Sequence, residues 1–378
     1  MPGDPVLASS PAVSTQFGDP LPGLTPDQLI AFNVGKAEFN TVKTKSIGLG
    51  PIFNNNSCVA CHSGPASGGS STIVVTRFGL VSNGQFDPLA ELGGSLLQSK
   101  FTDPVCREVI PAQANVTAKR QTTPLFGLGL VEAIPDAAIR ALALKRKPFG
   151  IQGKVSEVFD TPTSQTRVGR FGWKAQQATL LGFNSDAYLN EMGITNRFHP
   201  TENAPNGNTA VLETYDTVAD PEDVIDPQTN KGIVDLSTDF GKFLAPPPTT
   251  TLTTNARRGQ RLFSQIGCAI CHVPTLTTAS NADPVFDRKP VNLYSDLLLH
   301  DMGTLGDGIA QGTAGMQDMK TAPLWGLNAS GPYLHDGRAA TVDEAIRAHD
   351  GEAARTRDLY NRLSATQQQQ LLEFLNSI

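Results

Sequence analysis

The sequence predicts a mainly α-helical protein made of two related domains with long loops. Three observations lead to this prediction: a five-residue cysteine motif occurs twice, helix-capping signals recur, and strand patterning is sparse beyond residues 72–75. The 378 residues include 35 glycines and 27 prolines, which favour many loops. A hydrophobic fraction of 39% is sufficient for packed cores, so wholesale disorder is excluded.

Helix start signals justify the helical part of the prediction. Thr25, Thr341 and Ser364 are each followed three residues later by Gln or Glu, which is the pattern of a capping box. The predicted helices run from residue 26 to about residue 39, from 136 to 144, from 342 to 349, and from 365 into the C-terminal apolar stretch.

Charge and hydropathy exclude two classes of partner. The formal net charge is −6 and no basic run occurs, so nucleic-acid binding is not expected. No apolar run approaches the roughly 18 residues that a membrane span needs. Residues 1–5 lack the basic and apolar regions of a signal peptide, so we interpret the chain as a mature form with a start methionine added.

The two cysteine motifs carry the strongest functional signal. Residues 58–62 read Cys-Val-Ala-Cys-His, and residues 268–272 read Cys-Ala-Ile-Cys-His. This is the attachment signature of c-type haem: two cysteines about one helical turn apart form thioethers to one porphyrin, and the adjacent histidine binds the iron. Because c-type haem is attached outside the cytoplasmic membrane, we expect a periplasmic protein. The predicted attachment residues are Cys58, Cys61 and His62, and then Cys268, Cys271 and His272.

Other uses of paired cysteines fit the motifs less well. A thioredoxin-type pair lies between a strand and a helix, whereas Gly, Ser, Pro and Thr residues follow these motifs. A zinc site shared by both pairs would leave the adjacent histidines unexplained, and a disulfide would close a very small loop. The fifth cysteine, Cys106, is interpreted as a buried apolar residue, with a reactive thiol as the alternative.

The chain also reads as a divergent duplication. A helix-like segment with Gly and Phe four residues apart, first seen as Gly35 and Phe39, precedes each motif. A Thr-x-Pro-Leu-aromatic-Gly-Leu element follows each motif, at residues 122–128 and 321–327. The predicted units are an N-terminal c-haem domain at 1–200, an acidic and proline-rich linker region at 201–254, and a C-terminal c-haem domain at 255–378.

A wider resemblance rests on residues 48–54, 123–135, 169–175, 191–196, 296–303 and 331–338. In these stretches the chain resembles the di-haem c-type oxidoreductases, also called predicted thiol oxidoreductases. That family is distantly related to bacterial di-haem cytochrome c peroxidases and MauG-type enzymes. The resemblance implies two cytochrome-c-like haem domains, peroxidase-like chemistry and, as in some relatives, a calcium ion between the domains.

The resemblance also suggests how the second iron is ligated. Relatives carry its sixth ligand on the helix that follows the segment resembling residues 333–337, and His349 stands there. With His272 as the proximal ligand, this implies a bis-histidine iron. The alternatives are that His349 is a surface residue at a helix end, or that the ligand is one of Met302, Met316 and Met319.

The first haem is expected to have His62 as its proximal ligand and an open or water-filled distal site. Met192 and His199 are the nearest later candidates for a sixth ligand. Peroxide chemistry at an open iron needs an acid/base group, and Glu132 lies roughly where relatives carry a distal Glu or Gln. Its apolar neighbours would raise the pKa of a buried carboxyl. The alternative is an ordinary glutamate near a helix terminus.

Several other side chains are candidates for haem contact. Trp173 is predicted to relay electrons between the haems, with a buried core tryptophan as the alternative. Arg170, Lys174 and Arg338 are candidates for pairing with haem propionates, with solvated surface charge as the alternative. His335 is interpreted either as a haem-contacting residue or as a turn residue held by local hydrogen bonds.

These observations lead to one functional hypothesis and two alternatives. We expect a periplasmic di-haem oxidoreductase in which a soluble cytochrome or cupredoxin donates electrons to a six-coordinate C-terminal haem. The N-terminal haem then reduces hydrogen peroxide or a similar small oxidant. The alternatives are a non-catalytic di-haem electron carrier and a MauG-like enzyme that oxidises a protein or thiol partner.

Overall fold

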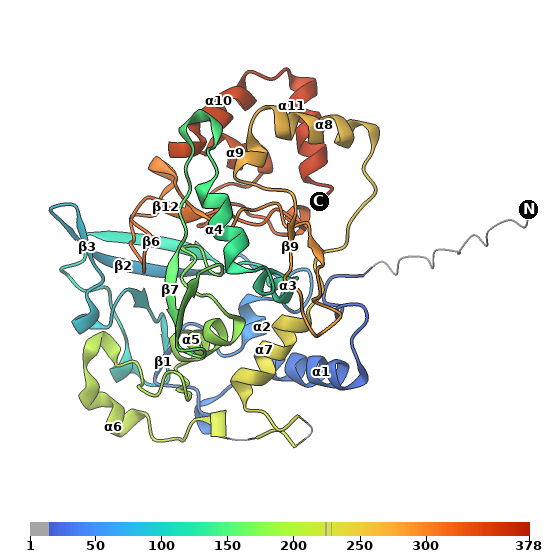
Figure 1. Ribbon diagram of the computed structural model, residues 1–378. Coiled ribbons are helices and arrows are strands. Elements are labelled where there is room, and N and C mark those ends of the chain that lie inside the picture. The colour runs from blue at the N-terminus through green and yellow to red at the C-terminus, as the bar shows by residue number, and fades with distance from the viewer. Residues whose placement is uncertain (1–14, 224, 228) are drawn as a thin grey trace, which may run out of the picture.

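The computed structural model describes residues 15–223, 225–227 and 229–378 (Figure 1). About 36% of the chain is helical and about 16% lies in strands, so the fold is mixed and not mainly α as predicted. The reason is a set of short antiparallel strand pairs in segments where the sequence indicates only loops. None of the helices in the described part of the chain is long and apolar enough to cross a membrane.

Two pairs of packed helices flank the haem motifs. Helix α1 (Pro26–Asn40) packs against α7 (Ile233–Phe243), and α8 (Thr254–Gln265) packs against α11 (Ala365–Leu375). The first pair lies at one end of the molecule and the second pair at the other (Figure 1). Each haem motif therefore has its own helical frame.

In both helix pairs, a glycine allows the two helices to pack closely. A Cβ atom on Gly35 would lie 2.2 Å from the carbonyl oxygen of Leu236, and one on Gly259 would lie 2.0 Å from that of Gln370. Such distances are far inside van der Waals contact, so the two backbones approach this closely only because each position lacks a side chain.

One helical turn after each glycine, a phenylalanine packs against a phenylalanine of the partner helix. The ring centroids of Phe39 and Phe240 are 4.7 Å apart, and those of Phe263 and Phe374 are 5.4 Å apart. The Gly–Phe spacing therefore has the same role in α1 and α8. The glycine allows the partner helix to approach, and the phenylalanine packs against that helix.

The region 201–254 does more than connect the two haem motifs. It contains α7, whose residues Ile233, Val234, Leu236 and Phe240 are buried. Apolar residues recur there at helical spacing and face α1, so this segment completes the N-terminal core. The prolines at 246–248 follow α7 without helix or strand. The domain boundaries themselves stay a prediction.

A small antiparallel sheet follows the first haem motif. Strand β2 (Val74–Ser82) pairs with β6 (Val116–Gln121), β3 (Gln85–Asp87) and β4 (Leu96–Leu97). The sequence indicates a strand only at 72–75, because the rest of β2 lacks a clear alternation of buried and exposed residues. Strand β6 ends immediately before the first Thr-x-Pro-Leu element and so positions it beside the haem motif.

The predicted capping boxes at Thr25, Thr341 and Ser364 are confirmed. The helix predicted for 342–349 ends at Arg347. The other helices are α2 (Cys58–Cys61), α3 (Leu128–Glu132), α4 (Asp136–Leu144), α5 (Leu180–Met192), α6 (Leu212–Tyr215), α9 (Val342–Arg347) and α10 (Ala354–Asn361). The other strand pairs are β1 (Ile52–Phe53) with β5 (Lys100–Phe101), β7 (Glu157–Asp160) with β8 (Gln165–Val168), β9 (Leu276–Thr277) with β10 (Pro290–Val291), and β11 (Leu299–Asp301) with β12 (Asp318–Lys320).

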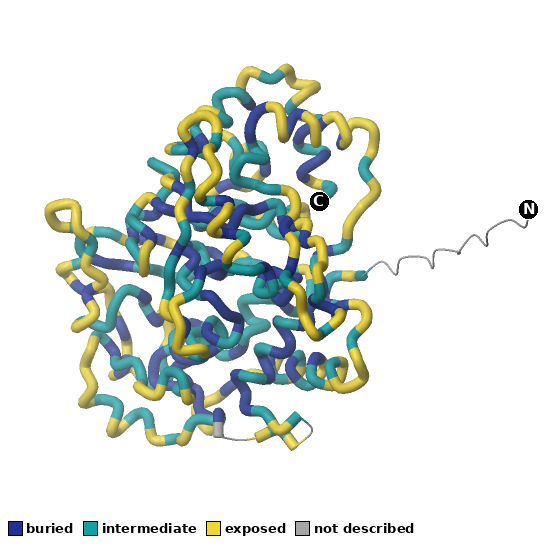
Figure 2. Tube along the Cα trace, in the orientation of Figure 1, coloured by how far each residue is buried: buried dark blue, intermediate teal, exposed yellow. Residues whose placement is uncertain are grey.

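The main apolar core joins residues from both ends of the chain. Phe39 and Phe240 belong to the same buried cluster as Leu293 and Leu297, while α8 and α11 enclose a second cluster. Figure 2 shows buried segments running through the centre of the molecule and exposed ones mainly in peripheral loops. Cys106 is also fully buried, as predicted.

Candidate functional site

The first cysteine motif is one turn of helix followed by a half-buried histidine. Ser57 caps α2 by accepting a hydrogen bond from the backbone of Ala60. His62 comes next, and its Nδ1 lies 3.1 Å from the carbonyl oxygen of Gly69. That contact occupies one ring nitrogen and leaves Nε2 as the nitrogen available to a metal.

The second motif repeats this arrangement with different neighbours. His272 Nδ1 lies 3.1 Å from the carbonyl oxygen of Tyr294. The ring of Phe263 lies 6.4 Å from that of His272, and the ring of Phe39 lies 6.1 Å from that of His62. The two histidines are thus oriented by the same two contacts: a backbone carbonyl oxygen and the phenylalanine ring of the preceding helix.

Burial favours the neutral form of the first cysteine and of the histidine in each motif. It raises the pKa of Cys58 and Cys268 to about 12 and lowers the pKa of His62 and His272 to about 4. A neutral imidazole has a lone pair for a metal, whereas a thiol with a raised pKa is a poor nucleophile for a redox pair. No cluster of possible metal ligands among the described residues joins the two cysteine pairs.

His349 lies directly opposite His272. Their ring centroids are 6.4 Å apart, and the pKa of His349 is lowered by burial. The Nδ1 atom of His349 lies 2.8 Å from the carbonyl oxygen of Ala345, so its Nε2 is again the available nitrogen. Because a metal–imidazole bond is about 2 Å long, two imidazoles on opposite sides of one metal have ring centres roughly 6 Å apart. The geometry therefore fits a metal between these two rings.

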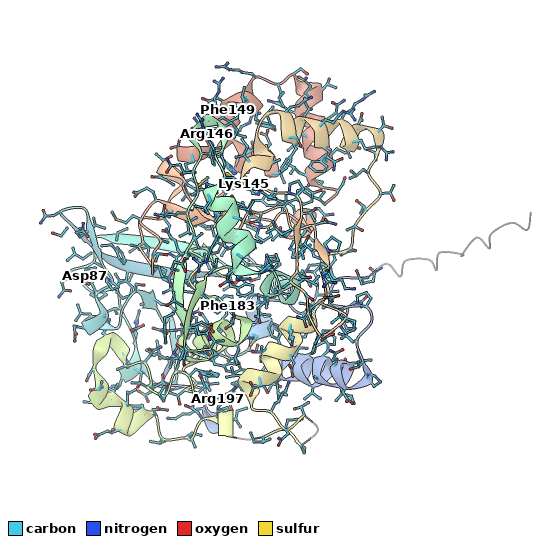
Figure 3. All side chains as sticks on the ribbon, in the orientation of Figure 1. Asp87, Lys145, Arg146, Phe149, Phe183 and Arg197 are labelled. Atoms are coloured by element: carbon cyan, nitrogen blue, oxygen red, sulfur yellow. The ribbon has the colours of Figure 1, made fainter. Side chains whose placement is uncertain are left out.

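A cavity of about 290 Å³ lies beside the second motif and extends toward the first, whose residues Cys58, Cys61 and His62 do not line it. Its walls include Cys268, Cys271, His272 and His349 from the second motif. From the region around the first motif they include Thr122, Thr123, Leu128, Val131 and Phe183, the last of which is labelled in Figure 3. Two residues of this wall, Gln121 and Thr356, have buried polar atoms without a hydrogen-bond partner, Oε1 and Oγ1. Such atoms are expected at a site that binds a large group with polar substituents.

Both tryptophans of the chain line this cavity. Trp173 donates its indole N–H to the carbonyl oxygen of Gln121 at 2.9 Å and meets the buried ring of His335 edge-on at 6.3 Å. Trp325 lies where the two repeated elements meet, since a Cβ atom on Gly127 would lie 2.8 Å from its ring. In the sequence, Trp325 stands at the position of the repeated element that Phe126 occupies in the first copy. That position alone did not indicate a function.

Glu132 lies behind the cavity wall. Its carboxylate accepts a hydrogen bond of 2.5 Å from the backbone N–H of Leu180, the first residue of α5, and burial raises its pKa as expected. The cavity-lining residues include its neighbour Val131 but not Glu132 itself. Its proposed acid/base role stays a prediction.

The charged candidates differ from one another in burial. Arg170 is only 1% exposed, donates to the carbonyl oxygens at the end of α3 and pairs with Asp136. Lys174 is fully buried and lies 2.8 Å from Asp307, so for both residues the solvated alternative is wrong. Arg338 is half-exposed and pairs with Asp336 outside the cavity wall. Propionate contacts stay a prediction for all three.

His300 forms an ion-pair cluster beside the second motif. Although burial opposes its charged form, hydrogen bonds to Asp296 at 3.0 Å and Glu352 at 2.6 Å help to raise its pKa to about 11. Ligand atoms of His300, Asp296 and Cys271 lie within 4.8 Å of one another. An imidazolium has no free lone pair, so this cluster is better explained by charge pairing than by metal binding. Calcium stays a prediction.

The remaining ligand candidates lie in different settings. Met192 is buried in an apolar cluster with Tyr188, and His199 belongs to a tight turn with Asn196. Neither lines the cavity, whereas Met302 and Met319 do. In the described part of the chain, His349 is the histidine whose ring is paired with a motif histidine.

Comparison with known proteins places these features in a family. The family described as "Di-haem oxidoreductase, putative peroxidase" matches residues 97–378, which include the second cysteine motif. The chain is 23% identical to cytochrome c peroxidase Ccp of Escherichia coli (strain K12) over 213 residues, covering 54% of this chain and 44% of that protein. It is 26% identical to the hydrazine synthase γ subunit of Kuenenia stuttgartiensis over 163 residues, covering 34% and 42%. The matches thus span less than half the length of these relatives.

Two solved structures are also similar. Hydrazine synthase of Kuenenia stuttgartiensis, pressurised with xenon, has a TM-score of 0.43 at 15% identity and covers 100% of both chains. A MauG-like protein associated with microbial copper homeostasis has a TM-score of 0.44 at 16% identity and covers 94% of this chain and 89% of that one.

Proposed function

Because the chain belongs to the di-haem oxidoreductase family, we propose that it is a periplasmic enzyme that uses electrons from a soluble donor protein to reduce hydrogen peroxide or a similar small oxidant. The carrying observation is an asymmetry between the two motifs. The second motif lines a cavity whose walls include Thr122 and Thr123 near the first motif, but not Cys58, Cys61 or His62. His272 is faced by a second histidine, whereas no second histidine ring is paired with His62 among the described residues. One site is therefore built for electron transfer, and the other is left open to a small ligand.

The residues of the two motifs fit covalently bound haem. Cys58, Cys61 and His62 would hold one haem, and Cys268, Cys271, His272 and His349 would hold the other. When bound, the haems supply one-electron transfer and, at an open iron, the reduction of peroxide by two electrons and two protons to two waters. Two donor molecules are then each oxidised by one electron per peroxide.

The protein's own contribution is orientation and proton supply. Backbone acceptors hold His62 and His272 in the tautomer that leaves Nε2 free. Arg170 ties the end of α3 to Asp136 and keeps Glu132 directly behind Val131 in the cavity wall. With its raised pKa, Glu132 is the proposed proton donor, and Trp173 is the proposed relay between the two sites.

The test uses protein matured in cells that attach c-type haem. We expect a ferric spectrum with both low-spin and high-spin components, of which only the high-spin part shifts on adding cyanide or peroxide. Reduced protein should be reoxidised by peroxide with two electrons consumed per molecule. A purely low-spin spectrum that ignores both ligands would instead identify an electron carrier and contradict the proposal.

A further inference from the structure

An exposed, positively charged patch lies beside the second cysteine motif. It consists of Leu144 at the end of α4 and of Lys145, Arg146 and Phe149 in the loop that follows, together with Arg355 of α10; we call it the docking patch. Leu144 is 87% exposed and Phe149 is 47% exposed. Figure 3 shows Arg146 and Phe149 near α10 and Lys145 close to the end of α4. Exposed large apolar residues beside unpaired charges are typical of protein-binding surfaces.

Phe149 connects this patch with the cavity. Its backbone has a φ of 62°, a left-handed conformation that is unfavourable for a bulky residue and that a folded structure must hold in place. A Cβ atom on Gly267 would lie 2.8 Å from the Phe149 ring and 3.0 Å from Thr356 Oγ1. Gly267 and Thr356 both line the cavity, and Gly267 directly precedes Cys268. The exposed ring therefore lies at the edge of the second haem motif.

The base of the loop is anchored, while its tip is free. Lys147 pairs with Asp296 at 3.1 Å, and the backbone N–H groups of Gln152 and Gly153 donate to Glu352 at 3.2 and 3.3 Å. Glu352 also pairs with His300, so its charge is already compensated. The patch is thus presented on a fixed support rather than on a loose loop.

The charges of the patch are uncompensated. In the described part of the chain, Lys145, Arg146 and Arg355 are exposed and form none of the ion pairs found in the structure. On the segment that carries Arg355, Asp350 and Asp358 share Arg357 as their ion-pair partner. A local excess of positive charge on a molecule with net charge −6 favours a partner that is acidic where it docks.

We propose that the docking patch receives the soluble electron donor, and that this donor is a small acidic cupredoxin-like protein with an apolar rim around its redox centre. The inference rests on the proposed function and names its partner. Leu144 and Phe149 supply a small apolar contact suited to a short-lived complex, and the cations attract and orient the acidic partner. One electron is transferred in each encounter, so the donor is oxidised by one electron and one iron would be reduced by one electron.

The first experiment measures binding, independently of catalysis. Oxidised plastocyanin, an acidic cupredoxin, is titrated into the di-haem protein at low and high salt. We expect Lys145→Glu/Arg146→Glu to weaken binding at least tenfold at low salt and to abolish the salt dependence. Leu144→Ser should weaken binding a few fold at any salt concentration. The matched control, Arg107→Glu/Lys119→Glu, reverses two exposed cations elsewhere and should bind within twofold of the unaltered protein.

The second experiment measures anaerobic reduction of the ferric protein by reduced plastocyanin, with no peroxide present. The docking variant should be reduced at least tenfold more slowly, while a small neutral reductant reduces both proteins equally. Equal binding and equal reduction of patch and control variants would overturn the proposal. So would a concentration-dependent dimer that the patch substitutions abolish, because the occupant would then be a second copy. If peroxide does not reoxidise the reduced protein, the proposed function is contradicted, whereas the binding and reduction results still test the docking patch.

Discussion

At the scale of single residues, environment decides what a histidine can do. His349 and His300 lie in the same part of the molecule, yet burial keeps His349 neutral while two carboxylates keep His300 protonated. Only the neutral ring has a nitrogen lone pair, so only His349 is equipped to bind a metal. Nothing in the local sequence around either histidine indicates these opposite charge states.

Replacing His349 with alanine tests its role as a ligand. Because the ring faces His272 at 6.4 Å, His349→Ala should remove one axial ligand and convert one haem from low to high spin. The measurement is the ferric absorption and electron paramagnetic resonance spectrum. His199→Ala, in a turn away from the cavity wall, is the control and should leave both signals unchanged. A low-spin signal that survives in His349→Ala would remove His349 from the ligand set.

Replacing Glu132 with glutamine tests its proposed acid/base role. The amide keeps the shape but cannot transfer a proton, so Glu132→Gln should slow peroxide reduction roughly 100-fold. Haem content and spin state should not change, since the side chain lies behind the cavity wall. Steady-state rates across pH provide the measurement. If the rate and its pH profile match those of the unaltered protein, Glu132 only caps α5.

At the scale of elements, helix crossings set the position of the haem motifs. α1 and α8 each carry a glycine at the crossing and a phenylalanine that contacts both the partner helix and the motif histidine. The capping boxes and the Gly–Phe spacing could be predicted from the sequence, because both depend on residues close together in the chain. The partner helix α7 could not be recognised in an acidic, proline-rich region, because its packing against α1 is a long-range contact.

Adding one methyl group at a crossing tests this account. Gly35→Ala places a Cβ atom 2.2 Å from the carbonyl oxygen of Leu236, so α1 and α7 must separate. We expect a loss of about 2–3 kcal/mol in the free energy of unfolding and a lower haem content. The control is Gly241→Ala on α7, where nothing lies within 4 Å and alanine should be neutral or stabilising. Denaturant unfolding of both variants distinguishes the outcomes, and equal stability would show that the crossing tolerates a side chain.

At the scale of the whole molecule, the two ends are tied together by buried charge. Asp307 accepts Arg120 from β6 and Lys174 from the segment that also carries Trp173, both at 2.8 Å. His300 likewise links Asp296 to Glu352. Such networks are costly to break, because removing one partner leaves a charge buried alone. They hold the walls of the cavity in one arrangement.

The stability of the whole molecule should therefore depend on pH through His300. Its folded-state pKa of about 11 exceeds the unfolded value, so its contribution is complete below about pH 6.5 and is lost as the pH rises toward 11. His300→Gln should be less stable by on the order of 2 kcal/mol at pH 6, and the difference should shrink by pH 10. Urea unfolding at several pH values measures this. A pH-independent difference would mean that His300 is not charged in the folded state.

The sequence by itself determined the two Cys-x-x-Cys-His motifs, the capped helices and the repeated Gly–Phe spacing, because each is a pattern of neighbouring residues. Only the tertiary structure decided how the His349 ring lies relative to His272, that Glu132 lies behind the cavity wall, that Arg170 and Lys174 are buried, and that Trp325 joins Trp173 on one cavity. These features depend on contacts between segments that are distant in the chain. Burial and pairing, which set each group's charge, exist only once those segments have packed together.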